Sequence, residues 1–337
     1  MTNSIRVVLT SLLFSVVIAG GGRTASFEAP QWAYPKTPRD FRPDVDDGAS
    51  KRLVGSTRSY TFKQIGDLFA PPDWYPAEHP RMPQVPVAKG RIPGVQACSS
   101  CHLPNGLGRP ESSSLAGLSV DYMTQQLADF KSGARHASVG ESPMAAIARA
   151  LTPEESAAAL AYYSRLPRAP WITVVEADMV PKTQVVENGL RIPLAAEELE
   201  PLGQRIVEVP KDPARARLYD SHDPFIAYVP KGSIRRGRAF VATGGAQTVG
   251  GQVIAGKAVA CSHCHGVTLR GMAHAPDSDQ PVPAIVGRSP TYMLRQLYDV
   301  HSGARSARST EMMKPIAAQM TLQQMIDAAA YLGSKAP

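Results

Sequence analysis

The feature that most constrains this chain is a five-residue pattern that occurs twice. Residues 98–102 read C-S-S-C-H, and residues 261–265 read C-S-H-C-H. These two stretches contain all four cysteines of the 337-residue chain. Whatever the fold, it must therefore present each pair of thiols, together with the histidine that follows, on one short turn.

Cysteine pairs at this spacing are compatible with disulfides, with a redox pair or with half of a zinc site. A four-cysteine zinc ribbon has its pairs about 15–20 residues apart, whereas these pairs are separated by about half of the chain. A histidine directly after the second cysteine is instead the signature of covalent haem c attachment. We therefore expect two haem c groups with two sets of protein ligands. The expected thioether residues are Cys98, Cys101, Cys261 and Cys264, and the expected proximal iron ligands are His102 and His265.

The two motifs belong to a longer internal repeat. The stretch "GLSVDYMTQQLADFKSGAR" ends at Arg135, and "GRSPTYMLRQLYDVHSGAR" ends at Arg305. The motifs are shifted by 163 positions and these later stretches by 170, so the second copy has seven additional residues in between. The repeat predicts two complete haem domains, at residues 91–168 and 231–337.

The order of these elements resembles that of dihaem class I cytochromes c of the cytochrome c4 or c553 type. It consists of C-x-x-C-H, then L-A-G or I-V-G, then Y-x-x-x-Q-L, S-G-A-R, a methionine and a capped helix with a tyrosine. The resemblance implies a mainly α fold with two tandem class I domains, whose haems lie close enough for rapid electron exchange. One departure is Ser113, which stands where the second copy has Pro283, the residue usual in this family.

The resemblance places the second axial ligand at a methionine just before the last helix. Met144 and Met313 occupy this position in the two copies, each eight residues before a threonine. We therefore expect Met144 and Met313 to complete the coordination of the two irons.

Other candidates for this ligand follow from the same repeat. Met123 and Met293 also match each other, but they fall inside an apparent helix, where methionine is a common core residue. Met312 is next to Met313 and could replace it. His136 and His301 have no histidine at the matching position of the other copy, so we expect them to be surface residues.

Local signals place the helices around the motifs. Thr152 with Glu155, and Thr321 with Gln324, have the spacing of a capping box at the start of a helix. An entry helix is expected in "SIRRGRAFVATGG" of the second domain, and its counterpart in the first domain is expected in "TFKQIGDLF".

The N-terminal 25 residues are typical of a secretory signal peptide. Arg6 precedes an apolar run over residues 7–19, which is shorter than the about 20 residues that span a bilayer. Small residues follow, with an expected cleavage site near Ala25. An uncleaved membrane anchor is the alternative. We expect an exported, periplasmic protein with no transmembrane segment after cleavage.

Two regions lie outside the resemblance. Residues 26–90 form a Pro-rich arm that we expect to be irregular. Residues 169–230 contain short β-prone runs broken by Pro and Gly, which predict either a small sheet or an extended linker. Trp74 and Trp171 border the first haem domain and are expected to fix these two regions to it.

Charge and ligation together suggest a function. The net charge of +7 suits acidic redox partners, and no block of Lys and Arg indicates binding to nucleic acid. An iron held by both His and Met has no free position for a substrate, and methionine raises its reduction potential. We therefore expect an electron carrier of a respiratory or dehydrogenase chain, or the cytochrome subunit of an oxidoreductase complex, without catalytic residues of its own. The alternative is a dihaem enzyme, a peroxidase or sulfur-compound oxidase, which would need an open iron position.

Overall fold

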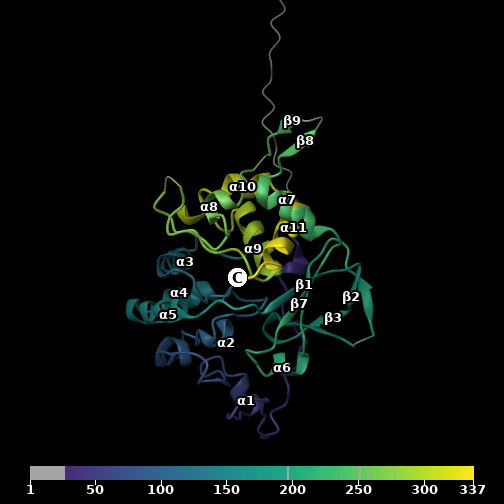
Figure 1. Cartoon of the computed structure of the whole chain (residues 1–337). Helices are drawn as coiled ribbons and strands as arrows, with labels where there is room; N and C mark the ends of the chain where they lie inside the picture. The colour runs from purple at the N-terminus through teal and green to yellow at the C-terminus, as the bar shows by residue number, and fades with distance from the viewer. Residues whose placement is uncertain (1–26, 196, 250–251, 257, 277) are drawn as a thin grey trace, which may run out of the picture.

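The computed structural model describes residues 27–195, 197–249, 252–256, 258–276 and 278–337. The expected signal peptide lies outside the described residues. In Figure 1 the helices that follow the first motif lie on the left, those of the second copy lie above them, and the strands of residues 169–230 lie on the right. No helix of the described part of the chain is long and apolar enough to cross a membrane.

The first helical group carries the first motif. Its elements are α2 (Ser99–His102), α3 (Val120–Ser132), α4 (Met144–Ala150) and α5 (Pro153–Arg165). Thr152 and Glu155 form the expected capping box at the start of α5. Ala159, Tyr162 and Leu166 pack inward from α5 and its end, as their helical spacing predicts.

The second helical group carries the second motif. Its elements are α7 (Ser233–Thr243), α8 (Ser262–His265), α9 (Pro290–His301), η4 (Arg308–Thr310), α10 (Lys314–Gln319) and α11 (Leu322–Gly333). Thr321 and Gln324 form the second expected capping box. Helix α7 crosses α11 closely at Gly237, where a Cβ atom would overlap the carbonyl oxygen of Asp327.

Residues 169–230 form a small sheet and two strand pairs, which confirms the first of the two expectations for this region. Strand β1 (Ile172–Glu176) pairs in parallel with β7 (Phe225–Val229), and β7 pairs antiparallel with β6 (Val207–Pro210). The remaining elements are β2 (Met179–Pro181) with β5 (Leu199–Pro201), β3 (Thr183–Val185) with β4 (Arg191–Pro193), η3 (Glu187–Gly189) and α6 (Pro213–Arg217). A hairpin of β8 (Gln247–Val249) and β9 (Gln252–Ile254) follows α7.

The arm contacts the second helical group and residues 169–230. Its first described residues, including η1 (Gln31–Ala33), reach the second group, where the Tyr34 hydroxyl donates to Asp299 Oδ1 at 2.7 Å. Further along, Trp74 is buried, and its Nε1 donates to the carbonyl of Leu218 at 2.7 Å. The arm is therefore a packed part of the molecule despite its many prolines.

The counterpart of α7 in the first copy is a different segment from the expected one. Helix α1 (Phe62–Ile65) in "TFKQIGDLF" has only four residues. Instead, η2 (Gln84–Ala88) takes this role: the amide of Cys98 donates to Pro86 O at 2.8 Å, as the amide of Cys261 donates to Val241 O at 3.0 Å. A long helix is excluded here because the prolines of "PQVPV" lack the amide that each helical turn needs.

Candidate haem-binding sites

Each motif forms one short helix that brings its thiols and imidazole together. In α2 the amide of His102 donates to Cys98 O at 3.0 Å, and in α8 the amide of His265 donates to Cys261 O at 2.9 Å. The backbone turns sharply after each histidine, with φ of 62° at Leu103 and 79° at Gly266. The structure thus gives both motifs the single turn that their spacing predicts.

Both histidine rings are oriented by a backbone carbonyl. His102 Nδ1 lies 2.8 Å from Ser113 O, and His265 Nδ1 lies 2.9 Å from Pro283 O. Because a carbonyl only accepts, Nδ1 carries the proton in each ring, and Nε2 keeps the lone pair that a metal requires. Ser113 serves as well as Pro283 because the acceptor is the backbone oxygen, which explains how the first copy accommodates the departure from the family pattern.

Burial favours the neutral form of both imidazoles. It lowers the pKa of His102 and of His265, while the hydrogen bonds to Ser113 O and Pro283 O act in the opposite direction. Neutral imidazole is the form that binds a metal, because a proton on Nε2 would block the ligand position.

A buried polar atom beside the first motif also fits a bound group. Tyr163 is almost completely buried, and its ring lies 6.2 Å from the ring of His102. Its hydroxyl has no hydrogen-bond partner among the described residues. A hydroxyl left without a partner inside a protein is unfavourable, and an acceptor supplied by a bound cofactor would remove this cost. The donor set and this orphaned hydroxyl both fit haem c.

The two candidate axial methionines lie at the start of equivalent helices. Met144 is the first residue of α4 and packs against a small cluster of Val95, Ile147 and Leu151. Met313 directly precedes α10. Both side chains are half-buried.

The competing candidates lie elsewhere. Met123 and Met293 are buried in the cores of the first and second helical groups, as the repeat predicts. His136 is exposed, as expected. The expectation for His301 was wrong: its Nδ1 lies 2.9 Å from Ala317 O, and its ring stacks on Phe27 of the arm at 4.7 Å. Nothing in the sequence indicated this contact, because the arm is distant from His301 in the chain.

The two copies meet through their S-G-A-R segments. The amide of His136 donates to Ala304 O, and the amide of Ser306 donates to Ala134 O, both at 2.9 Å. These bonds place Arg135 next to Arg305 in a buried contact. The repeat was visible in the sequence, but its role as a contact between the copies was not.

This contact also perturbs a buried tyrosine of the second copy. Burial raises the pKa of Tyr292, but the guanidinium groups of Arg135, Arg288 and Arg305 outweigh this effect and lower it to about 8. Arg135 lies 3.4 Å from the Tyr292 hydroxyl. The surroundings of this hydroxyl are therefore strongly positive.

The chain is similar to known cytochromes c. Residues 249–335 match the family model for cytochrome c. The chain is 27% identical over 141 residues to cytochrome c4 of Azotobacter vinelandii, a match that covers 37% of this chain and 66% of that protein. The chain thus spans slightly less than two thirds of the length of this relative.

Two solved structures are also similar. Cytochrome c4 of Acidithiobacillus ferrooxidans is 22% identical with a TM-score of 0.43, covering 71% of this chain and 98% of that chain. The thiosulfate dehydrogenase TsdBA of Marichromatium purpuratum is 23% identical with a TM-score of 0.42, covering 72% of this chain and 37% of that chain.

The class of protein follows from the motif geometry and the family match. Residues 249–335 are a cytochrome c domain, a family that binds haem c covalently. The paired motifs and the similarity to cytochrome c4 further support a dihaem class I protein that is cytochrome c4-like. The resemblance to cytochrome c4 that the sequence indicated is thereby confirmed.

Proposed function

We propose that the chain is an exported, periplasmic dihaem c-type cytochrome that carries single electrons between redox partners of a respiratory or dehydrogenase chain. The observation that carries this proposal is the matched pair of C-x-x-C-H helices, each with its histidine oriented by a carbonyl oxygen. A single such site would suffice for a carrier, whereas two would also allow electron exchange within the molecule.

The ligand set belongs to the same proposal. Cys98 and Cys101 would hold one haem c, and Cys261 and Cys264 the other. Each haem supplies a reversible one-electron couple. His102 with Met144, and His265 with Met313, would fill the axial positions, and methionine ligation raises the reduction potential. The protein contributes orientation, burial and exclusion of water around each site.

Tandem haem domains at residues 91–168 and 231–337 are also part of the proposal. The motif helices, the capped terminal helices and the Arg135–Arg305 contact are all related by the internal repeat. Such an arrangement would join the two haem-binding copies through one shared contact.

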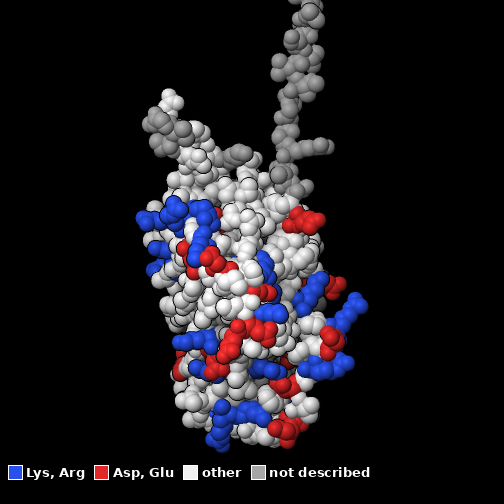
Figure 2. Space-filling view, turned by 90° about the vertical axis from the view of Figure 1, so that its right-hand side faces the viewer, with Lys and Arg blue, Asp and Glu red and all other residues white. Residues whose placement is uncertain are grey.

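The partners are proposed to be redox proteins with acidic docking surfaces. The support is the net charge of +7. On the side of the molecule in Figure 2, however, acidic groups are interspersed among the basic ones. The net charge therefore attracts a partner from a distance, and no single cationic patch on this side is required. Electron exchange should slow as salt screens this attraction.

Four measurements test the proposal. Mass spectrometry should show two haems per mature chain, retained after extraction with acid acetone. A redox titration should show two one-electron steps and the weak near-infrared band of Met-ligated ferric haem. Small mediators should exchange electrons rapidly with the protein, with negligible turnover of peroxide or thiosulfate. Substantial turnover of either substrate would assign the chain to the dihaem enzymes instead.

A further inference from the structure

The two motifs differ in how much of their surroundings is exposed. In the first copy Ser100, Pro104 and Arg109 are buried. The residues at the matching positions of the second copy are His263, Val267 and Met272, and all three are exposed. Val267 is 93% exposed. The same haem-binding turn is therefore covered by other parts of the chain in the first copy and exposed in the second.

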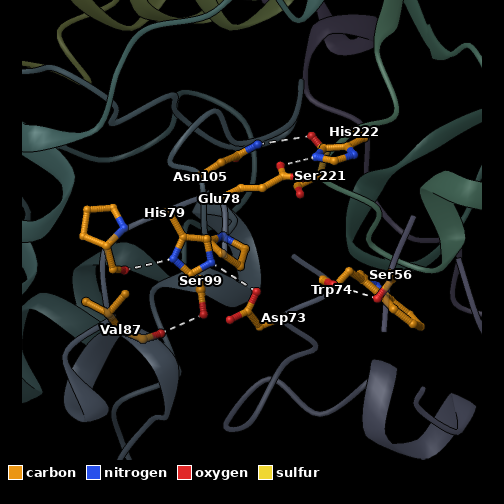
Figure 3. Close-up of polar contacts among 12 residues, drawn as sticks. Ser56, Asp73, Trp74, Glu78, His79, Val87, Ser99, Asn105, Ser221 and His222 are labelled. Carbon is orange, nitrogen blue, oxygen red and sulfur yellow. Dashed lines mark hydrogen bonds and ion pairs between the residues drawn. The ribbon is translucent and has the colours of Figure 1, made fainter. Parts of the chain in front are cut away.

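Polar contacts from two other regions cover the first motif (Figure 3). Ser99 Oγ, within the motif, donates to Val87 O of the arm at 2.7 Å. Asn105 Nδ2, three residues after the motif, donates to Ser221 O of the inter-domain segment at 3.1 Å. The Arg109 guanidinium, further along this loop, lies over the ring of Tyr219 at 4.7 Å.

The arm and the inter-domain segment are also joined to each other beside the first motif. The ring of His222 stacks on Tyr75 at 3.7 Å, and its Nε2 lies 2.6 Å from Glu78 Oε2. With the bond from Trp74 to Leu218 O, these residues form what we call the arm–linker clamp. Neither region belongs to the cytochrome c repeat, so this cover is an addition to the repeated domain.

The second motif is instead surrounded by exposed apolar side chains. We call this set the second-motif rim: Val259, Val267, Met272 and Met312. Met272 lies against Gly266, the residue between His265 and Val267. On the other side, Met312 and His263 line a hollow of about 400 Å³.

Four charged side chains beside the rim are already paired within the chain, whereas Arg270, exposed between Val267 and Met272, has no ion pair among the described residues. Arg308 lies 3.1 Å from Asp279, and Lys314 lies 2.6 Å from Glu311. A partner at this place would therefore gain more from apolar contact than from ion pairing. Exposed apolar clusters of this kind mark interaction sites.

We propose that protein partners exchange electrons with this chain at the second motif, whereas the arm–linker clamp closes the first motif to them. The fitting partner is a small electron-transfer protein whose own metal centre lies under an apolar surface. In each encounter one electron leaves the reduced metal of the partner and reduces the iron at the second site from ferric to ferrous, with no atom or proton transferred. An electron then passes within the molecule from the second site to the first. This inference rests on the proposed function.

Methionine oxidation offers a test of the contact itself. The haem-loaded protein is exposed briefly to hydroxyl radicals, alone and with saturating amounts of a purified blue-copper protein as the probe. Met272 and Met312 are each 39% exposed, and Met179 of the inter-domain segment, 46% exposed, is the matched control. We expect the probe to reduce sulfoxide formation at Met272 and Met312 at least threefold and to leave Met179 unchanged. Equal protection of all three, or of none, would overturn the assignment.

A second test measures electron transfer with matched variants. Val267→Asp places a charge in the rim, and Val54→Asp places one in the arm, where Val54 is 98% exposed. In stopped-flow experiments the rate from the reduced blue-copper protein should fall at least tenfold in V267D and stay unchanged in V54D. Exchange with a small uncharged mediator should stay the same in both.

The outcomes separate this inference from the proposed function. If V267D reacts with the probe as fast as the wild type, partners use another surface, including the first motif, and the inference is wrong. If the wild type exchanges with the mediator but never with the probe, the partner class is wrong. Among the outcomes of these two tests, only a failure to exchange with the mediator itself would contradict the proposed function.

Discussion

Arg135 and Arg305 occupy matching positions of the two repeats and lie against each other in the interior. Both guanidinium groups donate to the same amide oxygen, Gln126 Oε1, at 2.7 and 2.8 Å. They also share the amide oxygen of Gln296, at 2.9 and 3.2 Å. Two buried cations are thus held by neutral acceptors across a contact that the repeat makes nearly symmetric.

Replacing Gln126 by Leu should destabilise this contact. The substitution removes one acceptor from both Arg135 and Arg305, and buried charged donors without partners are unfavourable. We expect the free energy of unfolding to fall by about 3 kcal/mol in chemical denaturation. Lys131→Ala, at an exposed position of the same helix, should change it by less than about 0.5 kcal/mol. Equal effects of the two variants would show that the amide contributes little.

Replacing Met144 or Met313 by Ala should remove one Met-ligated spectrum each. The near-infrared band should lose about half its intensity, and one potential should fall by a sizeable part of the roughly 0.8 V range that axial ligands cover. The opened iron should then bind carbon monoxide. Met179→Ala, at an exposed position of strand β2, serves as the control. If both variants keep the wild-type spectra, the axial ligands are other residues, and Met312 becomes a candidate.

Glu155 should make the stability of the first helical group depend on pH. The Arg91 guanidinium donates to both carboxylate oxygens of Glu155, at 2.7 and 2.9 Å. This bidentate ion pair lowers the pKa of Glu155 to about 2. Because the folded state binds the proton less readily than the unfolded state, stability is present above about pH 4.5 and is lost as pH falls toward about 2.

The measurement is thermal unfolding of the wild type and of Glu155→Gln between pH 5 and about pH 2. The wild type should lose more stability over this range than E155Q does. Glu141→Gln, at an exposed site without an ion pair among the described residues, should follow the wild type. Parallel curves for all three proteins would contradict the role of the Arg91 contact.

Gly237→Ala should be destabilising although alanine is the better helix former. On an open helix this exchange would stabilise by about 0.5–1 kcal/mol. Here the added Cβ overlaps the carbonyl oxygen of Asp327, so α7 and α11 must separate. We expect a loss of about 1–3 kcal/mol in denaturant unfolding. Arg238→Ala, at the next and exposed position, tests whether the effect is specific to the crossing.

The sequence by itself determined the features that depend on neighbouring residues. The C-x-x-C-H turns and the capping boxes at Thr152 and Thr321 each depend on only four or five consecutive residues. The same few residues therefore indicate both the chemistry and the local backbone structure. The repeat also indicated the resemblance to dihaem cytochromes c, because the same order of short motifs occurs twice.

Only the tertiary structure decided what surrounds these local elements. The replacement of a helix by η2, the stacking of Phe27 on His301 and the contact of Tyr75 with His222 each join segments that are separated in the chain. Such contacts depend on which surfaces the folded chain brings together and buries. For that reason two motifs with nearly the same sequence are covered in one copy and exposed in the other.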